Sequence, residues 1–383
     1  MTELTPELRR RLRLNLNRVT LLFCLLLAAS DAFAQSAGTY IGGYGEMNYK
    51  HFVNGDVPRL DISRFVIYLD HSFSNRWMFK SETEIEHVKI KGGAGGEIGI
   101  EQAYLDYSAT HWLGWRGGLL VLPIGLMNQT HEPTTFYSVE RPLFDQIVIP
   151  STWAEIGTGI YGKASRTLHY QLYITEGLQT RNITMNGLDP AKQEGSAGAQ
   201  SSDLIAGSDA SHPAISGKLN FEPVMGLELG ASGYVERGYT QKISRAFVLG
   251  DLDAQFQQGP LRIRAEGAFI NTGDASDFSG VPLEIGGGYG EIAYDLFSLF
   301  KEKKSELDVF VRYEQFAFRQ REPVEIGGLL FPFTTTWSQH QAITGGVAYK
   351  PMNELILKAD YRWTNVDAGL ERREFALGAG YVF

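Results

Sequence analysis

Cysteine is nearly absent from this chain, with one among 383 residues, and a single thiol excludes a disulfide scaffold or a multi-cysteine zinc or iron–sulfur site. Basic residues are also in the minority. The chain has 35 Lys and Arg against 44 Asp and Glu, a net charge of −9, which argues against a nucleic-acid-binding protein with its usual basic face. Beyond the first 34 residues no stretch approaches the ~18 consecutive apolar residues that a transmembrane helix needs.

Glycine, by contrast, is abundant. Forty-three glycines are about 11% of the chain, against an average near 7%. Because glycine is unfavourable inside helices, a mostly helical protein is not expected. The 43% of hydrophobic residues and 21% of charged residues exclude a disordered chain.

Residues 1–34 have the pattern of an export signal. Five arginines between Arg9 and Arg18 precede an apolar run at 19–29, and Ala32-Phe33-Ala34 forms a small-x-small cleavage site. The apolar run has about half of the ~20 residues needed to span a bilayer, so it predicts a cleaved signal rather than an anchor. Phe23 argues against a lipoprotein signal ending at Cys24. The mature domain, 35–383, then has no cysteine and a net charge of −11, because the signal carries five arginines and three acids.

The mature domain alternates apolar and polar residues with a period of two, which is typical of strands with one apolar face. Between residues 77 and 86, Trp77, Phe79 and Ile85 alternate with Lys80, Glu82, Glu84 and Glu86. The same alternation recurs at 261–269, 307–314, 355–363 and 375–383. Each segment is about ten residues long, the length of a tilted strand that crosses a membrane.

Three features favour a membrane barrel over a soluble sandwich. The polar face carries consecutive ionised groups, which a packed core would reject. Aromatic residues lie at strand ends, as interfacial girdles require: Trp77, Tyr107, Trp115, Trp337, Trp363 and Tyr381. Short turns (74–75, 165–166, 222–226, 257–260, 351–353) alternate with longer polar links (91–97, 179–212, 271–282, 320–336).

These patterns predict one all-β domain, a transmembrane antiparallel β-barrel of about sixteen strands. The strands are expected near 39–51, 60–73, 76–90, 98–108, 115–125, 156–165, 167–176, 213–222, 227–238, 243–256, 261–271, 284–298, 306–318, 337–350, 354–365 and 372–383. Sixteen strands leave an aqueous channel, whereas eight would be filled by their own side chains.

With an export signal, an even strand count and a terminal aromatic residue, Phe383, the chain resembles a Gram-negative porin. It is more specifically similar to the phosphate-selective porin O and P family, through the Arg-Pro…Pro-x-x-Trp…Gly run between Arg141 and Gly162. The resemblance implies a third extracellular loop that folds into the lumen, a homotrimer, and pore-lining ladders of arginine and lysine. This sequence has only short arginine runs and more acids than bases on its polar face.

Nine charged residues are the candidates for lining or narrowing the pore. They are Lys80, Glu82 and Glu84 on an early strand, Arg141, Asp145 and Glu155 in the expected inward loop, and Arg262, Arg264 and Arg312 on later strands. Each also has a plainer interpretation. The glutamates could form a hydrated wall balanced by bases, Arg141 and Asp145 could pin the loop while Trp153 packs it, and the arginines could pair with acids of neighbouring strands.

No catalytic, cofactor or metal site is expected. A metal site of Glu82, Glu84 and Glu86 with His87 is disfavoured because His87 has the opposite parity, and the eight histidines lack metal-ligand spacing. The glycine clusters near 42–43, 92–96 and 286–288 are not followed by a helical segment, so they do not indicate a nucleotide loop.

The sequence therefore predicts a porin for passive diffusion of small hydrophilic solutes and ions, with anions such as phosphate as the family's substrate. The expected partners are outer-membrane lipid, the solutes and two further copies of the chain, with no nucleic acid. We expect weak selectivity without a saturable phosphate site. The alternatives are an adhesive or structural barrel that uses the 179–212 loop, and a membrane lipase with His87 beside Ser81 or Thr83.

Overall fold

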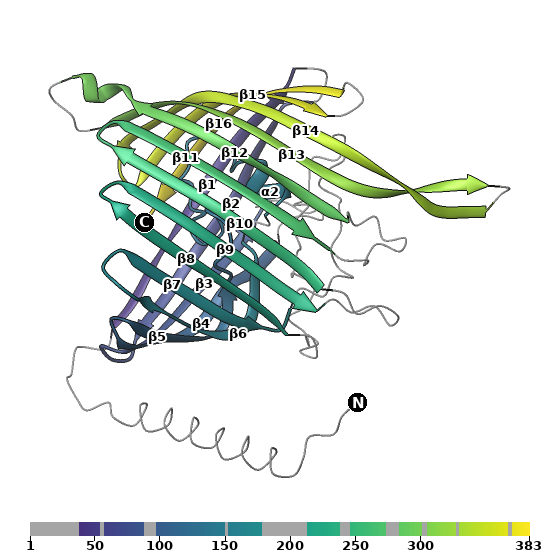
Figure 1. The fold of residues 1–383 in the computed structure, drawn as a ribbon. Coiled ribbons are helices and arrows are strands. Elements are labelled where there is room, and N and C mark those ends of the chain that lie inside the picture. The colour runs from purple at the N-terminus through teal and green to yellow at the C-terminus, as the bar shows by residue number, and fades with distance from the viewer. Residues whose placement is uncertain are drawn as a thin grey trace, which may run out of the picture. The chain divides into compact units, whose positions relative to one another are not determined.

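The computed structural model describes residues 38–53, 57–87, 97–149, 152–177, 213–237, 246–272, 283–300, 305–326, 329–366 and 370–383 (Figure 1). The expected export signal, residues 1–34, lies outside these ranges. No helix in the described part of the chain is long and apolar enough to cross a membrane.

Sixteen antiparallel strands form a closed barrel in which each strand pairs with its neighbours in the sequence. The strands are β1 (Gly38–Phe52), β2 (Arg59–Ser72), β3 (Trp77–Glu86), β4 (Glu97–Thr110), β5 (Leu113–Val121), β6 (Ala154–Lys163), β7 (Leu168–Thr175), β8 (Ala214–Val224), β9 (Leu227–Arg237), β10 (Ala246–Gln258), β11 (Leu261–Asn271), β12 (Glu284–Asp295), β13 (Glu306–Ile326), β14 (Leu329–Met352), β15 (Leu355–Val366) and β16 (Leu370–Val382). The barrel closes where β1 pairs with β16, from Tyr44↔Val382 to Phe52↔Glu374. The predicted all-β barrel is confirmed.

The two faces of the wall follow the predicted alternation. On β11, Ile263 and Phe269 are exposed on the outside, whereas Glu266 between them faces inward and is buried. Because a side chain switches face at every residue of a strand, one apolar set covers the outside of the barrel and one polar set lines the lumen. The outer surface is consequently rich in exposed isoleucine, leucine and valine.

Some predicted boundaries were wrong. The expected polar link 320–336 continues as paired strand, because β13 and β14 extend as a two-stranded ribbon to Ile326↔Leu329. Figure 1 shows this ribbon reaching past the neighbouring strands. β5 ends at Val121 rather than 125, because the chain there turns inward. β12 ends at Asp295, whose side chain accepts a hydrogen bond from Phe297 and caps a short 3-10 helix, η3 (Leu296–Leu299).

The connections differ at the two ends of the barrel. Tight turns at 73–76, 164–167, 225–226, 259–260 and 353–354 join strands at one end, as predicted, and the connection containing η3 is a longer exception at that end. At the other end, most of the predicted long links 91–97, 179–212 and 271–282 lie outside the described residues. The link between β5 and β6 is described, and it positions the candidate site.

Candidate functional site

The connection from β5 to β6, residues 122–149 and 152–153, is called the inserted loop below. Side chains from at least seven strands form hydrogen bonds with its backbone: Arg64 of β2, Lys218 of β8, Ser232 of β9, Glu266 of β11, Glu314 of β13, Lys350 of β14 and Asp360 of β15. These strands are spread around a closed barrel, so only a segment inside the lumen can reach all of them. The predicted inward-folded third loop is confirmed.

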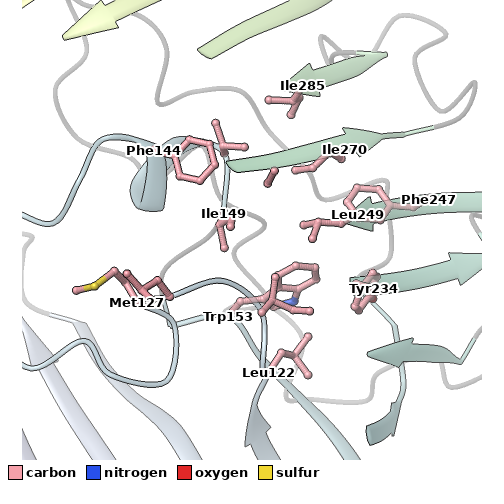
Figure 2. Packing of buried hydrophobic residues seen from close by; sticks show 14 of the residues in the cluster. Leu122, Met127, Phe144, Ile149, Trp153, Tyr234, Phe247, Leu249, Ile270 and Ile285 are labelled. Atoms are coloured by element: carbon pink, nitrogen blue, oxygen red, sulfur yellow. The ribbon is translucent and has the colours of Figure 1, made fainter. Parts of the chain in front are cut away.

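An apolar cluster holds one side of the inserted loop against the wall (Figure 2). The loop contributes Leu122, Ile149, Trp153 and Phe144, the last from the single-turn helix α2 (Phe144–Ile147), and strands β9 to β12 contribute residues such as Tyr234. Burial of this apolar surface stabilises the folded-in position, at roughly 25 cal/mol for each Å² removed from water.

Trp153 ends the inserted loop and is 2% exposed. Its ring centroid lies 4.6 Å from that of Tyr234, and its indole N–H donates to Oε1 of Glu155 at 3.0 Å. The Glu155 carboxylate also accepts from the hydroxyls of Thr175 and Tyr234. Trp153 therefore has the packing role that the sequence suggested. Glu155 is 1% exposed and its carboxylate is held in this network, so it stabilises the end of the inserted loop and does not face water.

Glu140 forms a charged pin between the loop and the wall. Its carboxylate binds Lys50 of β1 and, at 2.7 Å, Arg362 of β15, which also binds Glu374 at 2.8 Å. Burial alone would raise the pKa of Glu140, but the charges of Lys50 and Arg362 outweigh it and lower the pKa to about 2. Glu140 therefore stays ionised at neutral pH. The sequence did not single it out, and its place in the inserted loop was the only signal.

Among the residues that the structure describes, Asp145 has no ion-pair partner. It is 1% exposed, and among the described residues no amide, hydroxyl or cationic donor reaches either carboxyl oxygen. Its carboxyl group lies next to that of Glu266. Burial, with added repulsion from Glu314 and Asp251, raises the pKa of Asp145 to about 8. Asp145 is thus a neutral acid buried between the inserted loop and the wall.

The two predicted arginines near the loop differ in their surroundings. Arg312 is fully buried, bonds Glu314 and Glu291 at 3.0 Å each, and donates to Ser138 of the inserted loop at 2.7 Å. It is an anchor and not a water-facing charge, because the loop covers it. Arg141 is half-buried, and burial together with nearby Arg64 lowers the pKa of its guanidinium.

Beside the inserted loop lies an open cavity of about 380 Å³, lined by loop residues and by side chains of β10, β11 and β14. Its charged lining residues are Arg262, Arg264 and Lys350, all cations. Arg262 bonds Asp308 and, at 3.0 Å, Glu306; Arg264 lies 4.0 Å from Glu291 and stacks over Tyr137 of the loop. These arginines therefore pair with acids of neighbouring strands and also line open space, so the two interpretations offered by the sequence are compatible. Lys350 was missed, although its parity on β14 places it inward.

On β3, Lys80, Glu82 and Glu84 all face the lumen, as predicted. Lys80 is half-buried, and Glu84 lies 3.8 Å from Arg64. Glu82 belongs to a buried group that the sequence did not predict, which also contains Glu101 of β4 and His131 of the inserted loop. Burial alone would lower the pKa of His131, but Glu101 and Glu82 outweigh it and raise the pKa to about 9.

His87 lies away from this group, as its parity predicted. Its Nδ1 is 2.5 Å from a carboxylate oxygen of Asp61, an orienting partner that the sequence did not indicate. Ser81, however, donates its hydroxyl to the carbonyl of Leu69 at 2.7 Å and not to a histidine. The structure therefore does not assemble the Ser81–His87 pair, one of the two pairs that the lipase alternative offered.

A protein of Aquifex aeolicus (strain VF5), described as uncharacterized, is a sequence relative of this chain. It is 32% identical over 353 residues, which cover 87% of this chain and 77% of the relative. This chain belongs to the same family. No family model matches the chain.

Several solved structures share the fold of this chain at low sequence identity. The anion-selective porin from Comamonas acidovorans aligns with a TM-score of 0.56 and 11% identity, over 91% of this chain and 100% of that one. OmpT of Vibrio cholerae, an outer membrane protein described in a trimer form, aligns with a TM-score of 0.56 and 12% identity, over 91% and 100%. The chain therefore has the fold of an outer-membrane porin.

Proposed function

We propose that the protein is a porin of a Gram-negative outer membrane, through which small hydrophilic solutes and ions diffuse passively. One observation carries the proposal: the inserted loop lies inside a closed sixteen-strand barrel and narrows its lumen beside an open, cation-lined cavity. A loop that narrows an aqueous lumen without filling it sets which solutes pass. An adhesive or structural barrel has no need of such a loop.

The outer surface supports a position in a lipid bilayer. Exposed apolar side chains such as Ile67, Leu252 and Val309 lie on strands on different sides of the barrel, where a soluble protein would carry polar groups. Trp77, Tyr107 and Trp115 form an aromatic cluster at strand ends, with ring centroids 4.6 and 6.1 Å from Trp77, as expected at a membrane interface. Residues 1–34 would direct export to that membrane, leaving 35–383 as the mature barrel.

The finer proposal is a weak preference for anions. The lumen acids are mostly buried beneath the loop or paired, whereas the open cavity is flanked by Arg262, Arg264 and Lys350. The resemblance to the phosphate-selective porin O and P family agrees with this preference, as does the anion selectivity of the Comamonas porin. We further propose a homotrimer, the state implied by the resemblance and described for the Vibrio protein.

Planar-bilayer recording of the purified full chain tests the proposal. We expect stepwise, long-lived conductance increments and a small reversal potential of anion sign in a potassium chloride gradient. Folded protein should also migrate differently on a gel before and after boiling, because a closed barrel resists mild detergent. If the protein is heat-modifiable, and therefore folded, but gives no conductance, the structural or adhesive barrel would be favoured over the porin.

A further inference from the structure

Glu82, Glu101 and His131 meet beneath the inserted loop, each supplied by a different segment: β3, β4 and the loop itself. Nε2 of His131 lies 3.4 Å from Oε2 of Glu101 and 3.6 Å from Oε1 of Glu82. We propose that these three side chains bind a divalent transition-metal ion of the zinc class, which fastens the inserted loop to the barrel wall.

The distances from the imidazole nitrogen to the two carboxylates fit such an ion, and all three ligand atoms lie within 4.8 Å of one another. Two ligands each about 2.1 Å from a tetrahedral zinc ion are about 3.4 Å apart. The distances from the imidazole nitrogen to the two carboxylate oxygens are close to this value and longer than good hydrogen bonds. The two carboxylates also neutralise the charge of a dication. The metal ion together with its three ligands would therefore carry no net charge in this buried site.

Outer hydrogen bonds orient the ligands as metal sites require. Nδ1 of His131 lies 2.8 Å from the backbone carbonyl of Asn128, so Nδ1 keeps its proton and Nε2 is the ligand atom, which releases its own proton when the metal binds. Oε2 of Glu82 accepts from the side-chain amide of Gln102 at 2.6 Å, which leaves Oε1 for the metal. Such outer partners fix the tautomer and the rotamer of the ligands before the metal binds.

The carboxylates themselves supply an independent observation. Glu82 is 2% exposed and Glu101 is 7% exposed, and the Oε1 atom of each has no hydrogen-bond donor among the described residues. Buried carboxylate oxygens are costly unless a donor or a cation satisfies them. The unsatisfied Oε1 of Glu82 is the atom that faces His131, so a cation at the centre of the group would satisfy it.

The imidazole ligand decides the class of ion. Mg²⁺ and Ca²⁺ prefer six or more oxygen ligands, whereas imidazole with carboxylates suits zinc and its neighbours among the transition metals. With three protein ligands the fourth position is left for water.

The test measures metal content and not conductance, so its failure would leave the porin proposal intact. The full chain is stripped with a chelator, folded in detergent with Zn²⁺, passed through gel filtration and analysed for zinc. We expect one zinc per chain. Co²⁺ in place of zinc should give the intense visible absorption of a tetrahedral nitrogen–oxygen site.

Isosteric variants test the ligands without creating a cavity at the site. Glu101→Gln and Glu82→Gln should each weaken zinc binding at least tenfold, and Gln102→Met, which removes only an outer hydrogen bond, about ten- to a hundredfold. His87→Gln is the matched control, because this exposed histidine also contacts a carboxylate, and it should leave binding unchanged. Heat-modifiable gel migration verifies that each variant folds. Zinc affinity equal to wild type in folded Glu101→Gln, or folded wild type without stoichiometric zinc, would overturn the proposal.

Discussion

At the residue scale, the inserted loop decides what each lumen charge does. Arg264 of β11 and Arg312 of β13 both project inward from strands on either side of β12, yet Arg312 is fully buried under the loop and Arg264 borders open space. The partner that covers Arg312, Ser138, is 174 residues away in the sequence. The alternation predicted that both arginines face inward, but it could not predict which of them the loop would cover.

Asp145 makes the docking of the loop depend on pH. Its pKa is raised from about 3.9 in an unfolded chain to about 8, so the folded state holds a proton that the unfolded state releases. This contribution is fully present below the unfolded pKa and is lost as the pH rises towards the folded pKa. Between pH 4 and pH 8 the free energy of unfolding should therefore fall.

Asp145→Asn should remove this dependence, because an amide can donate to Glu266 at every pH. We expect the variant to be more stable than wild type at pH 9, by about 1–3 kcal/mol, with little difference at pH 4. Urea unfolding in detergent, followed by tryptophan fluorescence, measures this. Asp61→Asn is the control on a half-exposed aspartate outside the inserted loop. Parallel pH profiles for wild type and Asp145→Asn would show that Asp145 is already ionised in the folded state.

At the element scale, the strands were predictable because their alternation is local. All sixteen appear close to their expected positions, since one face must meet lipid and the other water. Glu101 escaped prediction because β4 contains a bulge: Glu82 pairs with Gln102 and Thr83 with Ile100, which leaves Glu101 without a partner residue. Parity reverses there, from exposed Ile98 and Ile100 to buried Tyr104. A bulge inserts one residue and turns the following side chains to the opposite face, and the sequence carried no signal for it.

The extension of β13 and β14 is independent of the barrel wall. Pairing between β12 and β13 ends at Glu284↔Arg319, and pairing between β14 and β15 begins at His340↔Val366. Replacing residues 321–335 with Asn-Gly, a two-residue turn that suits a hairpin, should therefore preserve heat-modifiable migration and conductance. Gly346→Val is the destabilising comparison, because a Cβ there would lie 2.3 Å from the carbonyl oxygen of Ala359. Loss of folding in the shortened chain would mean that the ribbon supports the barrel.

The packing of the inserted loop depends strongly on Trp153. Trp153→Ala removes a side chain that is 2% exposed and packed on Tyr234, and truncations of this kind cost about 3–5 kcal/mol. The strands do not need this contact, so we expect a normal barrel with larger and noisier single-channel currents. Trp112→Ala is the matched control, because Trp112 is 51% exposed at a turn. Unchanged currents in folded Trp153→Ala would place the narrowest point of the pore away from the loop.

For the whole molecule, the net charge of the chain and the charge of the residues lining the cavity beside the inserted loop differ in sign. The chain carries −9 overall, which favours cations, whereas the cavity beside the loop presents Arg262, Arg264 and Lys350. Charges act on a permeating ion mainly within a Debye length, about 8 Å at physiological salt, so these three cations count for more than distant acids. The ion pairs of Arg262 with Asp308 and Glu306 weaken the positive electrostatic field of the three cations. Under the proposed function we therefore expect a weak preference for anions.

Arg262→Ala combined with Arg264→Ala should shift the reversal potential towards cations, changing the permeability ratio about twofold, because Lys350 and the paired acids remain. Arg373→Ala, which removes an exposed arginine paired with Glu371, should leave the reversal potential unchanged. Because the arginines are already partly paired, phosphate should not block chloride current in a saturable way. A block at micromolar to millimolar phosphate that the double change abolishes would contradict this prediction, and would show that these arginines form a specific phosphate site.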